Sequence, residues 1–206
     1  KSTFAERIRD GLSCSCEIMR LDCYYFDQGG KPFEERTKVN YDSPKIFDFD
    51  EMLADIRLLL DGKPVTRKGY NYVEHRRDDS EELMYPPEVL IIEGIHVFYD
   101  DRICDAMNLK LFIKVDSDIC LLRRIARDMN ERGRSLESIS EQYKATVKPM
   151  REKYIDRYID KADVVVMRGG MNEQALKTTI SYLKSCVKEQ RLAESEKNES
   201  DGNDSE

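Results

Sequence analysis

The 206-residue chain lacks a hydrophobic run of membrane-spanning length, and its first residues do not resemble a signal peptide. We therefore expect a cytoplasmic protein with no membrane partner. The chain also lacks an excess of basic residues, since 34 Lys and Arg stand against 41 Asp and Glu, for a formal net charge of -7. Neither a basic surface nor an aromatic platform accompanies its arginines, which argues against nucleic acid as a partner.

The cysteines lack the spacing of a metal site. Cys14 and Cys16 are too close together for a zinc knuckle, and no histidine accompanies them. The other four cysteines are scattered along the chain and also lack the spacing of a metal site; they are Cys23, Cys104, Cys120 and Cys186. We interpret all six as reduced structural thiols, although Cys23 lies beside a candidate catalytic residue.

The composition fits one soluble α/β domain, because 40% of the residues are hydrophobic and 36% are charged. A chain of this length is sufficient for one sizeable core. The segment 189–206 is rich in acidic residues and has almost nothing to bury. We predict a folded domain over 1–188 and an acidic, disordered tail over 189–206.

Short apolar runs alternate with amphipathic segments along the folded part. Strands are predicted at 17–21, 88–92, 109–115 and 163–167. Asp48 with Glu51 forms a helix start, and Asn172 can cap the last helix. Strands separated by helices imply a mostly parallel sheet with helices on both faces. Such sheets bind ligands beyond the carboxyl ends of their strands, where Asp22 and Glu93 fall.

Five arginines lie within the segment 123–134 of this acidic protein. Arg124 and Arg127 are three residues apart and would share one face of a helix that Gly133 is suited to end. Guanidinium groups donate bidentate hydrogen bonds to phosphate oxygens, so the cluster indicates a phosphate site. The alternative is a solvated helix whose arginines pair with Asp128 and Glu131.

The chain starts with Lys1-Ser2-Thr3, which runs into an amphipathic helix. Lys followed by Ser or Thr at a helix start is how a phosphate-binding P-loop ends, with the lysine on the outer phosphates and the hydroxyl on magnesium. Glu93, at the end of an apolar strand, could hold the same metal. In that interpretation the first strand and the glycine-rich loop are missing from this chain.

Taken together, the motifs resemble the uridine kinase family (the uridine–cytidine kinases among P-loop kinases), from Lys1 to about Lys184. The segments that carry the resemblance are 22–25, 40–44, 70–75, 93–95, 123–134, 142–143, 147–149, 162–163 and 168–170.

The resemblance implies a three-layer P-loop kinase fold with a β-hairpin excursion near 66–86 and an arginine-rich lid. It implies transfer of the γ-phosphate of ATP or GTP, with Mg²⁺, to the 5′-hydroxyl of uridine or cytidine. The products would be UMP or CMP, made in pyrimidine salvage. A homotetramer is a further expectation of the family.

The resemblance also implies roles at the reacting end of the site. Asp22 matches the catalytic aspartate, which would orient the hydroxyl and take its proton late. The matching lid arginines are Arg127, Arg132 and Arg134. The nucleotide would be bound by Lys1, Ser2 and Thr3, and the metal by Ser2 and Glu93.

On the nucleoside side, Asp42 matches the carboxylate that holds the ribose hydroxyls, together with Arg124. Tyr70 and His75 match the pair that reads the base. Further contacts are implied for Tyr25, for Gln142 and for Tyr41, which stands where we associate phenylalanine with the family. His96 replaces a residue that is usually apolar, and it is assigned no role.

Two alternatives stay open. One is a relative such as phosphoribulokinase or pantothenate kinase, which acts on a different alcohol; a base-reading pair argues against it, because those substrates have no pyrimidine. The other is a truncated, inactive homologue that acts through assembly with other chains.

Overall fold

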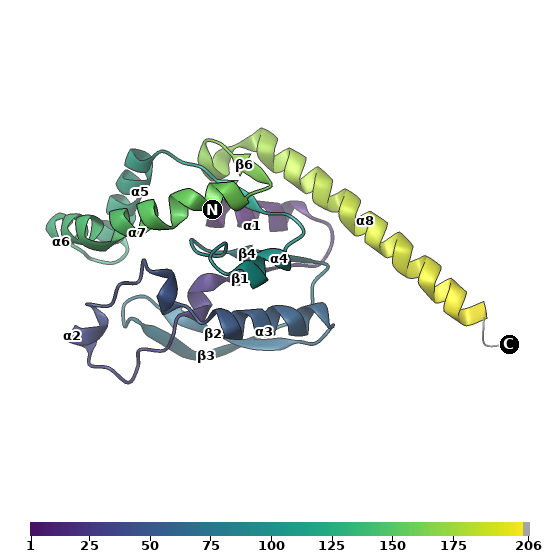
Figure 1. Ribbon diagram of the computed structural model, residues 1–206, viewed down its shortest axis with the longest axis horizontal. Coiled ribbons are helices and arrows are strands. Elements are labelled where there is room, and N and C mark those ends of the chain that lie inside the picture. The colour runs from purple at the N-terminus through teal and green to yellow at the C-terminus, as the bar shows by residue number, and fades with distance from the viewer. Residues whose placement is uncertain (204–206) are drawn as a thin grey trace.

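The computed structural model describes residues 1–203 and has an α/β architecture (Figure 1). β1 (Cys16–Arg20) and β4 (Val89–Glu93) pair in parallel, with Ile18 opposite Ile91. β5 (Leu111–Ile113) and β6 (Val164–Val166) form a second parallel pair. All four strands fall within one or two residues of the predicted runs, which confirms the strand assignments.

The parallel sheet is divided in two. Within residues 1–203, β4 pairs with β1 only and β5 pairs with β6 only, so no described strand joins the two pairs. The predicted mostly parallel sheet is therefore present as two parallel pairs. β2 (Val65–Asn71) and β3 (Arg76–Met84) form a separate antiparallel hairpin, as expected near 66–86.

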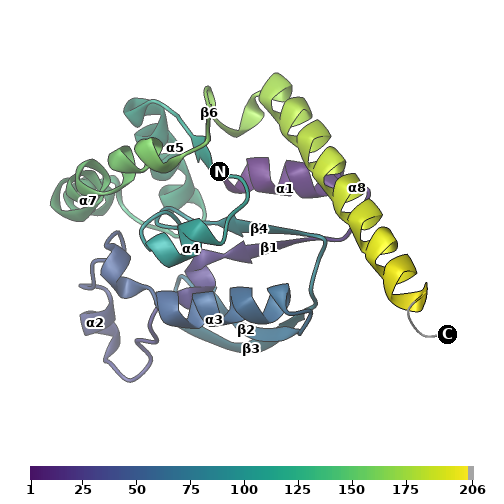
Figure 2. The ribbon, with the colours of Figure 1, turned by 45° about the vertical axis from the view of Figure 1, so that its right-hand side comes forward.

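Helices cover both faces of the β1–β4 pair (Figure 2). α1 (Ser2–Gly11) lies on one face and contacts α8 (Glu173–Asn203), whereas α3 (Phe49–Leu60) and the hairpin lie on the other. The remaining helices are α2 (Phe33–Arg36), α4 (Asp101–Asp105), α5 (Ser117–Asn130), α6 (Leu136–Gln142) and α7 (Lys148–Lys153).

Both predicted helix starts are confirmed. The Asp48 carboxylate accepts from the Glu51 backbone N–H at 2.9 Å, and Asn172 Oδ1 accepts from the Ala175 N–H at 3.1 Å. Each side chain satisfies a backbone donor that the first helical turn leaves without a partner.

Three apolar clusters hold the layers together, and the smallest consists of Phe98, Cys104 and Tyr158. The largest one joins β1, α3 and the hairpin through Met19, Met52 and Val65. The second joins α1 to α8 and β6 through Phe4, Leu176 and Val166. The carboxyl ends of β1 and β4 lie between the largest and the second cluster, so the residues that follow both strands are fixed by packing on both faces.

The acidic C-terminal segment differs from the disordered tail that its composition predicts. α8 continues as a helix through Asn203 and extends away from the body (Figure 1). Arg191 pairs with Glu88 at 2.6 Å, and Gln190 donates to Glu194 one turn later. The segment is rich in Glu, its first turns also hold Gln190, Arg191, Leu192 and Ala193, which favour helix, and it contains no glycine before Gly202. Residues 204–206 of the predicted tail lie outside the described residues.

In the part of the chain that the structure describes, every helix is too short or too polar to be a membrane-spanning candidate.

Candidate active site

Lys1 and Ser2 meet Glu93 where α1 begins beside the end of β4. Lys1 Nζ lies 2.7 Å from Glu93 Oε1, and the Ser2 hydroxyl donates to the same oxygen at 2.7 Å. Burial of Glu93 opposes its ionisation, but Lys1 and the Ser2 hydroxyl outweigh this and lower its pKa. The structure thus brings together three of the residues predicted for the nucleotide and metal. Thr3, the fourth, is exposed beside Gly170.

Asp22 stands on the short 3₁₀ helix Leu21–Tyr24 that follows β1. Because Arg20 is in register with Glu93, the chain reaches Asp22 at the same end of the strand pair as Glu93. The Tyr72 hydroxyl donates to Asp22 Oδ2 at 2.6 Å. Burial, followed by the Asp22 charge, raises the pKa of Tyr72, so the phenol keeps its proton for this hydrogen bond.

Tyr72 is a residue to which the sequence interpretation assigned no role. The Arg132 guanidinium lies 4.9 Å from the centre of the Tyr72 ring, within the range of a cation–π contact. Tyr72 therefore links the hairpin to both Asp22 and the arginine-rich segment. Tyr72 follows β2 in the hairpin turn, two residues after Tyr70, and the centres of the two rings lie 5.2 Å apart; this spacing of two is the signal that could have identified it.

The arginines gather around Asp128, whose side chain is 0% exposed. Arg127 Nε donates to Asp128 Oδ1 at 3.0 Å and Arg132 Nη1 donates to it at 3.2 Å. Arg124 and Arg134 approach Asp128 Oδ2 at 3.5 and 3.8 Å. Four guanidinium groups around one carboxylate leave a large excess of positive charge, which suits an anionic ligand.

Gly133 makes this gathering possible. Its φ is +63°, a conformation that favours glycine, and it lies just beyond the end of α5. The chain turns back there, so that the Arg134 N–H donates to the Asp128 carbonyl at 3.0 Å. The predicted helix stop is confirmed, and the alternative ion pair with Asp128 is present as well.

Gln142 lies between the arginines and Asp42, the residue predicted to bind the ribose. Its Oε1 accepts from Arg124 Nη2 at 2.9 Å and also from Arg134 Nη1. One turn later in the same helical segment, the Thr146 hydroxyl donates to Asp42 Oδ2 at 3.0 Å. Arg124 Nη1 lies 3.8 Å from Asp42 Oδ1, so the predicted ribose pair is assembled. Thr146 was not predicted; its spacing of four from Gln142 is the signal that places it on the same face.

Aromatic rings form the wall next to Asp42. Tyr25 lies 4.6 Å from Tyr70 and 5.6 Å from Tyr41, measured between ring centres. Tyr41 stacks on His75 at 5.2 Å with an interplanar angle of 24°. Apart from their contact with each other, the buried hydroxyls of Tyr41 and Tyr70 lack a hydrogen-bond partner in the described structure. They are thus available to a bound ligand.

His75 sits at the hairpin tip with a φ of +50°, which is unusual for a residue with a side chain. Burial lowers the pKa of His75, and the charges of Arg134, Arg36 and Arg132 lower it further. The imidazole is therefore neutral at neutral pH and offers one donor and one acceptor.

Tyr25 also belongs to the protein core, since it is 7% exposed and stacks on Phe47 at 4.3 Å. Cys23, its neighbour but one, is not activated, because burial raises the pKa of the Cys23 thiol. All six cysteines are free, which agrees with reduced thiols.

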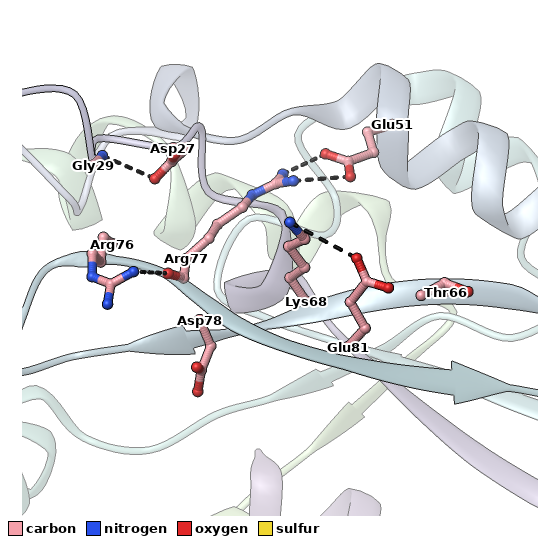
Figure 3. A pocket seen from close by; sticks show the side chains of 9 residues that line it. All are labelled: Asp27, Gly29, Glu51, Thr66, Lys68, Arg76, Arg77, Asp78 and Glu81. Carbon is pink, nitrogen blue, oxygen red and sulfur yellow. Dashed lines mark hydrogen bonds and ion pairs between the residues drawn. The ribbon is translucent and has the colours of Figure 1, made fainter.

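A polar cavity of about 420 Å³ lies beside the hairpin and is distinct from the predicted site, none of whose residues line it. Figure 3 shows Arg77 making two contacts to Glu51 of α3 inside it. Arg77 Nε also donates to the Tyr25 carbonyl at 2.7 Å. Arg77 of the hairpin thus holds the main chain of Tyr25, a residue of the aromatic wall. Its contacts with Glu51, inside the cavity, attach the hairpin to α3.

Comparisons with known proteins identify the family of the chain. Residues 1–175 match the family model described as the phosphoribulokinase / uridine kinase family. A uridine kinase of Ligilactobacillus salivarius is 41% identical over 189 residues, which is 91% of this chain and 89% of the relative. A uridine kinase of Streptococcus pyogenes is 45% identical over 190 residues, or 92% of this chain and 91% of the relative.

The solved structures agree on the fold. A phosphoribulokinase from Rhodobacter spheroides superposes with a TM-score of 0.61 at 14% identity, covering 81% of this chain and 64% of that protein. This likeness concerns the fold alone and confirms the predicted P-loop kinase type. With a family match over most of its length and relatives above 40% identity, the chain belongs to the phosphoribulokinase / uridine kinase family.

Proposed function

We propose that the protein is a pyrimidine ribonucleoside kinase, which transfers the γ-phosphate of ATP or GTP to the 5′-hydroxyl of uridine or cytidine. The products are UMP and CMP, as in pyrimidine salvage. The relatives named uridine kinase support this activity, since they align with about nine-tenths of the chain.

One observation carries the choice of substrate. Asp42 and Arg124 lie together beside a wall of Tyr41, Tyr70 and a neutral His75. A carboxylate accepts hydrogen bonds from two vicinal hydroxyls, which suits a ribose, and the aromatic wall with a neutral imidazole suits a planar base. A sugar phosphate such as ribulose 5-phosphate would leave the aromatic wall without a partner.

Phosphoryl transfer requires positioning and charge neutralisation more than covalent chemistry. Asp22, held by Tyr72, would orient the 5′-hydroxyl and accept its proton as the phosphoryl group departs. Arg127, Arg132 and Arg134 would neutralise the transferring group while Asp128 keeps them gathered. Lys1 would reach the outer phosphates of the donor.

Ser2 and Glu93 fit a magnesium ion. Mg²⁺ prefers oxygen ligands and is commonly held by one or two carboxylates, substrate phosphates and water. The Ser2 hydroxyl and the ionised Glu93 carboxylate lie 2.7 Å apart and offer such a set. When bound, the ion would neutralise charge on the phosphates.

The experiment is a substrate panel. The full-length protein is incubated with magnesium and either ATP or GTP, and offered uridine, cytidine, ribulose 5-phosphate or pantothenate. We expect UMP and CMP to form and the other two alcohols to remain unchanged. Phosphorylation of ribulose 5-phosphate or pantothenate in preference to both nucleosides would contradict the proposal.

A further inference from the structure

His96 is a buried histidine that the proposed reaction does not use. It lies in the loop after β4, three residues beyond Glu93, and its side chain is 0% exposed. Aromatic rings surround it, with the centres of Tyr158, Phe47 and Tyr154 at 5.9, 6.0 and 6.0 Å. An apolar residue would pack well among these rings, so the imidazole needs a specific reason to be there.

Both ring nitrogens of His96 have hydrogen-bond partners. Nε2 lies 2.8 Å from the Asp42 backbone carbonyl, and Nδ1 lies 2.9 Å from the Tyr158 hydroxyl. A carbonyl oxygen can only accept, so Nε2 carries the proton. Burial lowers the pKa of His96, which leaves the ring neutral, and Nδ1 therefore accepts from Tyr158. The tyrosine fixes the tautomer that the carbonyl requires.

The carbonyl that His96 binds belongs to the residue with the ribose-binding carboxylate. Asp42 lies in a loop, where no strand or helix fixes its main chain. Its backbone N–H donates to Asn40 Oδ1 at 3.1 Å, and its carboxylate accepts from the Thr146 hydroxyl at 3.0 Å. Arg124 lies 3.8 Å from the same carboxylate, and His96 supplies the attachment of the Asp42 main-chain carbonyl. This hydrogen bond connects the loop of Asp42 to the end of β4, where Glu93 would face the phosphates of the donor.

We propose that His96 is a positioning residue that sets where Asp42 stands relative to the phosphate end of the site, and thereby controls ribonucleoside binding. The inference rests on the proposed function, in which Asp42 binds the ribose hydroxyls. Two hydrogen bonds connect Tyr158 through the His96 imidazole to the Asp42 main chain. This connection acts on nucleoside affinity and on ribose selectivity, because it touches neither the nucleotide nor Asp22.

The variants separate hydrogen bonding from packing. His96→Leu keeps an apolar side chain of similar size and removes both hydrogen bonds. His96→Gln retains an N–H donor that can reach the Asp42 carbonyl. Tyr158→Phe leaves the imidazole in place and removes the group that fixes its tautomer. Ile103→Val, a change to a fully buried residue of α4, controls for a loss of stability alone.

The first measurement needs no substrate. Hydrogen–deuterium exchange of residues 40–44 should be about tenfold faster in His96→Leu than in the wild type, and near the wild-type rate in His96→Gln and Ile103→Val. Unchanged protection of this loop in His96→Leu would overturn the proposal. Should His96→Leu fail to fold, Tyr158→Phe decides in the same way, with a smaller acceleration expected.

The second measurement is steady-state kinetics with uridine, 2′-deoxyuridine and ATP. His96→Leu should raise the KM for uridine about tenfold and reduce the preference for uridine over 2′-deoxyuridine, with kcat and the KM for ATP nearly unchanged. His96→Gln should restore most of both properties. An equal rise in KM for uridine and 2′-deoxyuridine, or a fall in kcat alone, would overturn the positioning role of His96. A wild type inactive on uridine would refute the proposed function instead, and loop exchange would still decide on His96.

Discussion

At the scale of single residues, the site depends on side chains whose partners come from distant parts of the chain. Asp22 follows β1, yet its hydrogen-bond donor Tyr72 comes from the hairpin and the cation on that ring, Arg132, follows α5. Sequence motifs identified Asp22 and Arg132 separately. Tyr72 and Thr146 were not identified, because their spacing from Tyr70 and Gln142 does not show which element faces them.

The first prediction concerns His75. His75→Ala removes the imidazole that stacks on Tyr41 and should weaken uridine binding by about 0.5–3 kcal/mol, which is the range for one buried hydrogen bond. The KM for ATP should change little, because Lys1 and Ser2, which we propose bind the nucleotide, contact Glu93, whereas His75 contacts Tyr41. Steady-state kinetics with each substrate varied in turn provides the measurement. Val73→Ala, in the same hairpin turn but 69% exposed, is the control and should behave as the wild type. Uridine kinetics unaffected by His75→Ala would leave the histidine with a structural role only.

At the scale of elements, the turn after α5 decides whether the arginines form a site. Periodicity places Arg124 and Arg127 on a helix, and Gly133 predicts its end. Only the fold shows that the chain reverses there and surrounds Asp128. The sequence does not show whether a carboxylate among arginines is exposed or buried. The alternative of a solvated helix with ion pairs therefore stayed open.

The second prediction concerns this buried carboxylate. Asp128→Asn keeps the size of the side chain but removes the negative charge that four guanidinium groups share. The free energy of unfolding should fall by about 1–3 kcal/mol at low salt, a value reduced from that of a fully buried pair because the arginines are partly exposed.

Urea unfolding with and without inorganic phosphate measures the effect. Phosphate should stabilise Asp128→Asn more than the wild type, because the anion can take the place of the missing carboxylate. Glu131→Gln, an exposed change at the end of the same helix, is the matched control. If phosphate stabilised neither Asp128→Asn nor the wild type, the arginines would not form an anion site.

At the scale of the whole molecule, the order of strands and helices could be predicted because each element has a clear local signal. The continuous apolar run of β4 and the caps at Asp48 and Asn172 are examples. Two features could not be predicted. The separation of the parallel strands into two pairs is a property of their spatial order, and α8 continues beyond residue 189 because helix-favouring residues there outweigh the lack of apolar contacts.

The third prediction follows from the two histidines of the chain, His75 and His96. Burial lowers the pKa of each from the ordinary value of 6.5. As the pH falls through about 6.5, the histidines of the unfolded chain bind protons, whereas those of the folded protein stay neutral. The contribution of the two neutral histidines to stability is therefore complete above pH 6.5 and decreases as the pH falls below it. The slope should reach up to about 1.4 kcal/mol per pH unit for the fully buried His96 and should be smaller for the partly exposed His75, where water screens the charges. Urea midpoints at pH 7.5, 6.5 and 5.5 measure it, and replacement of both histidines by glutamine should flatten the profile. A wild-type profile that is already flat would mean that neither imidazole resists protonation.

The proposed reaction depends most on the different roles of two carboxylates, Asp22 at the reacting end of the site and Asp42 beside the aromatic wall. Single-turnover phosphorylation of uridine by the full-length protein with saturating magnesium and ATP, combined with equilibrium binding of uridine, tests it directly. In Asp22→Asn the rate constant should fall about a hundred- to ten-thousand-fold while uridine affinity changes little, because the group that accepts the hydroxyl proton is lost. In Asp42→Asn uridine binding and the preference for ribose should suffer more than the rate constant. Near-normal turnover in Asp22→Asn would contradict the role of Asp22 as the acceptor of the hydroxyl proton.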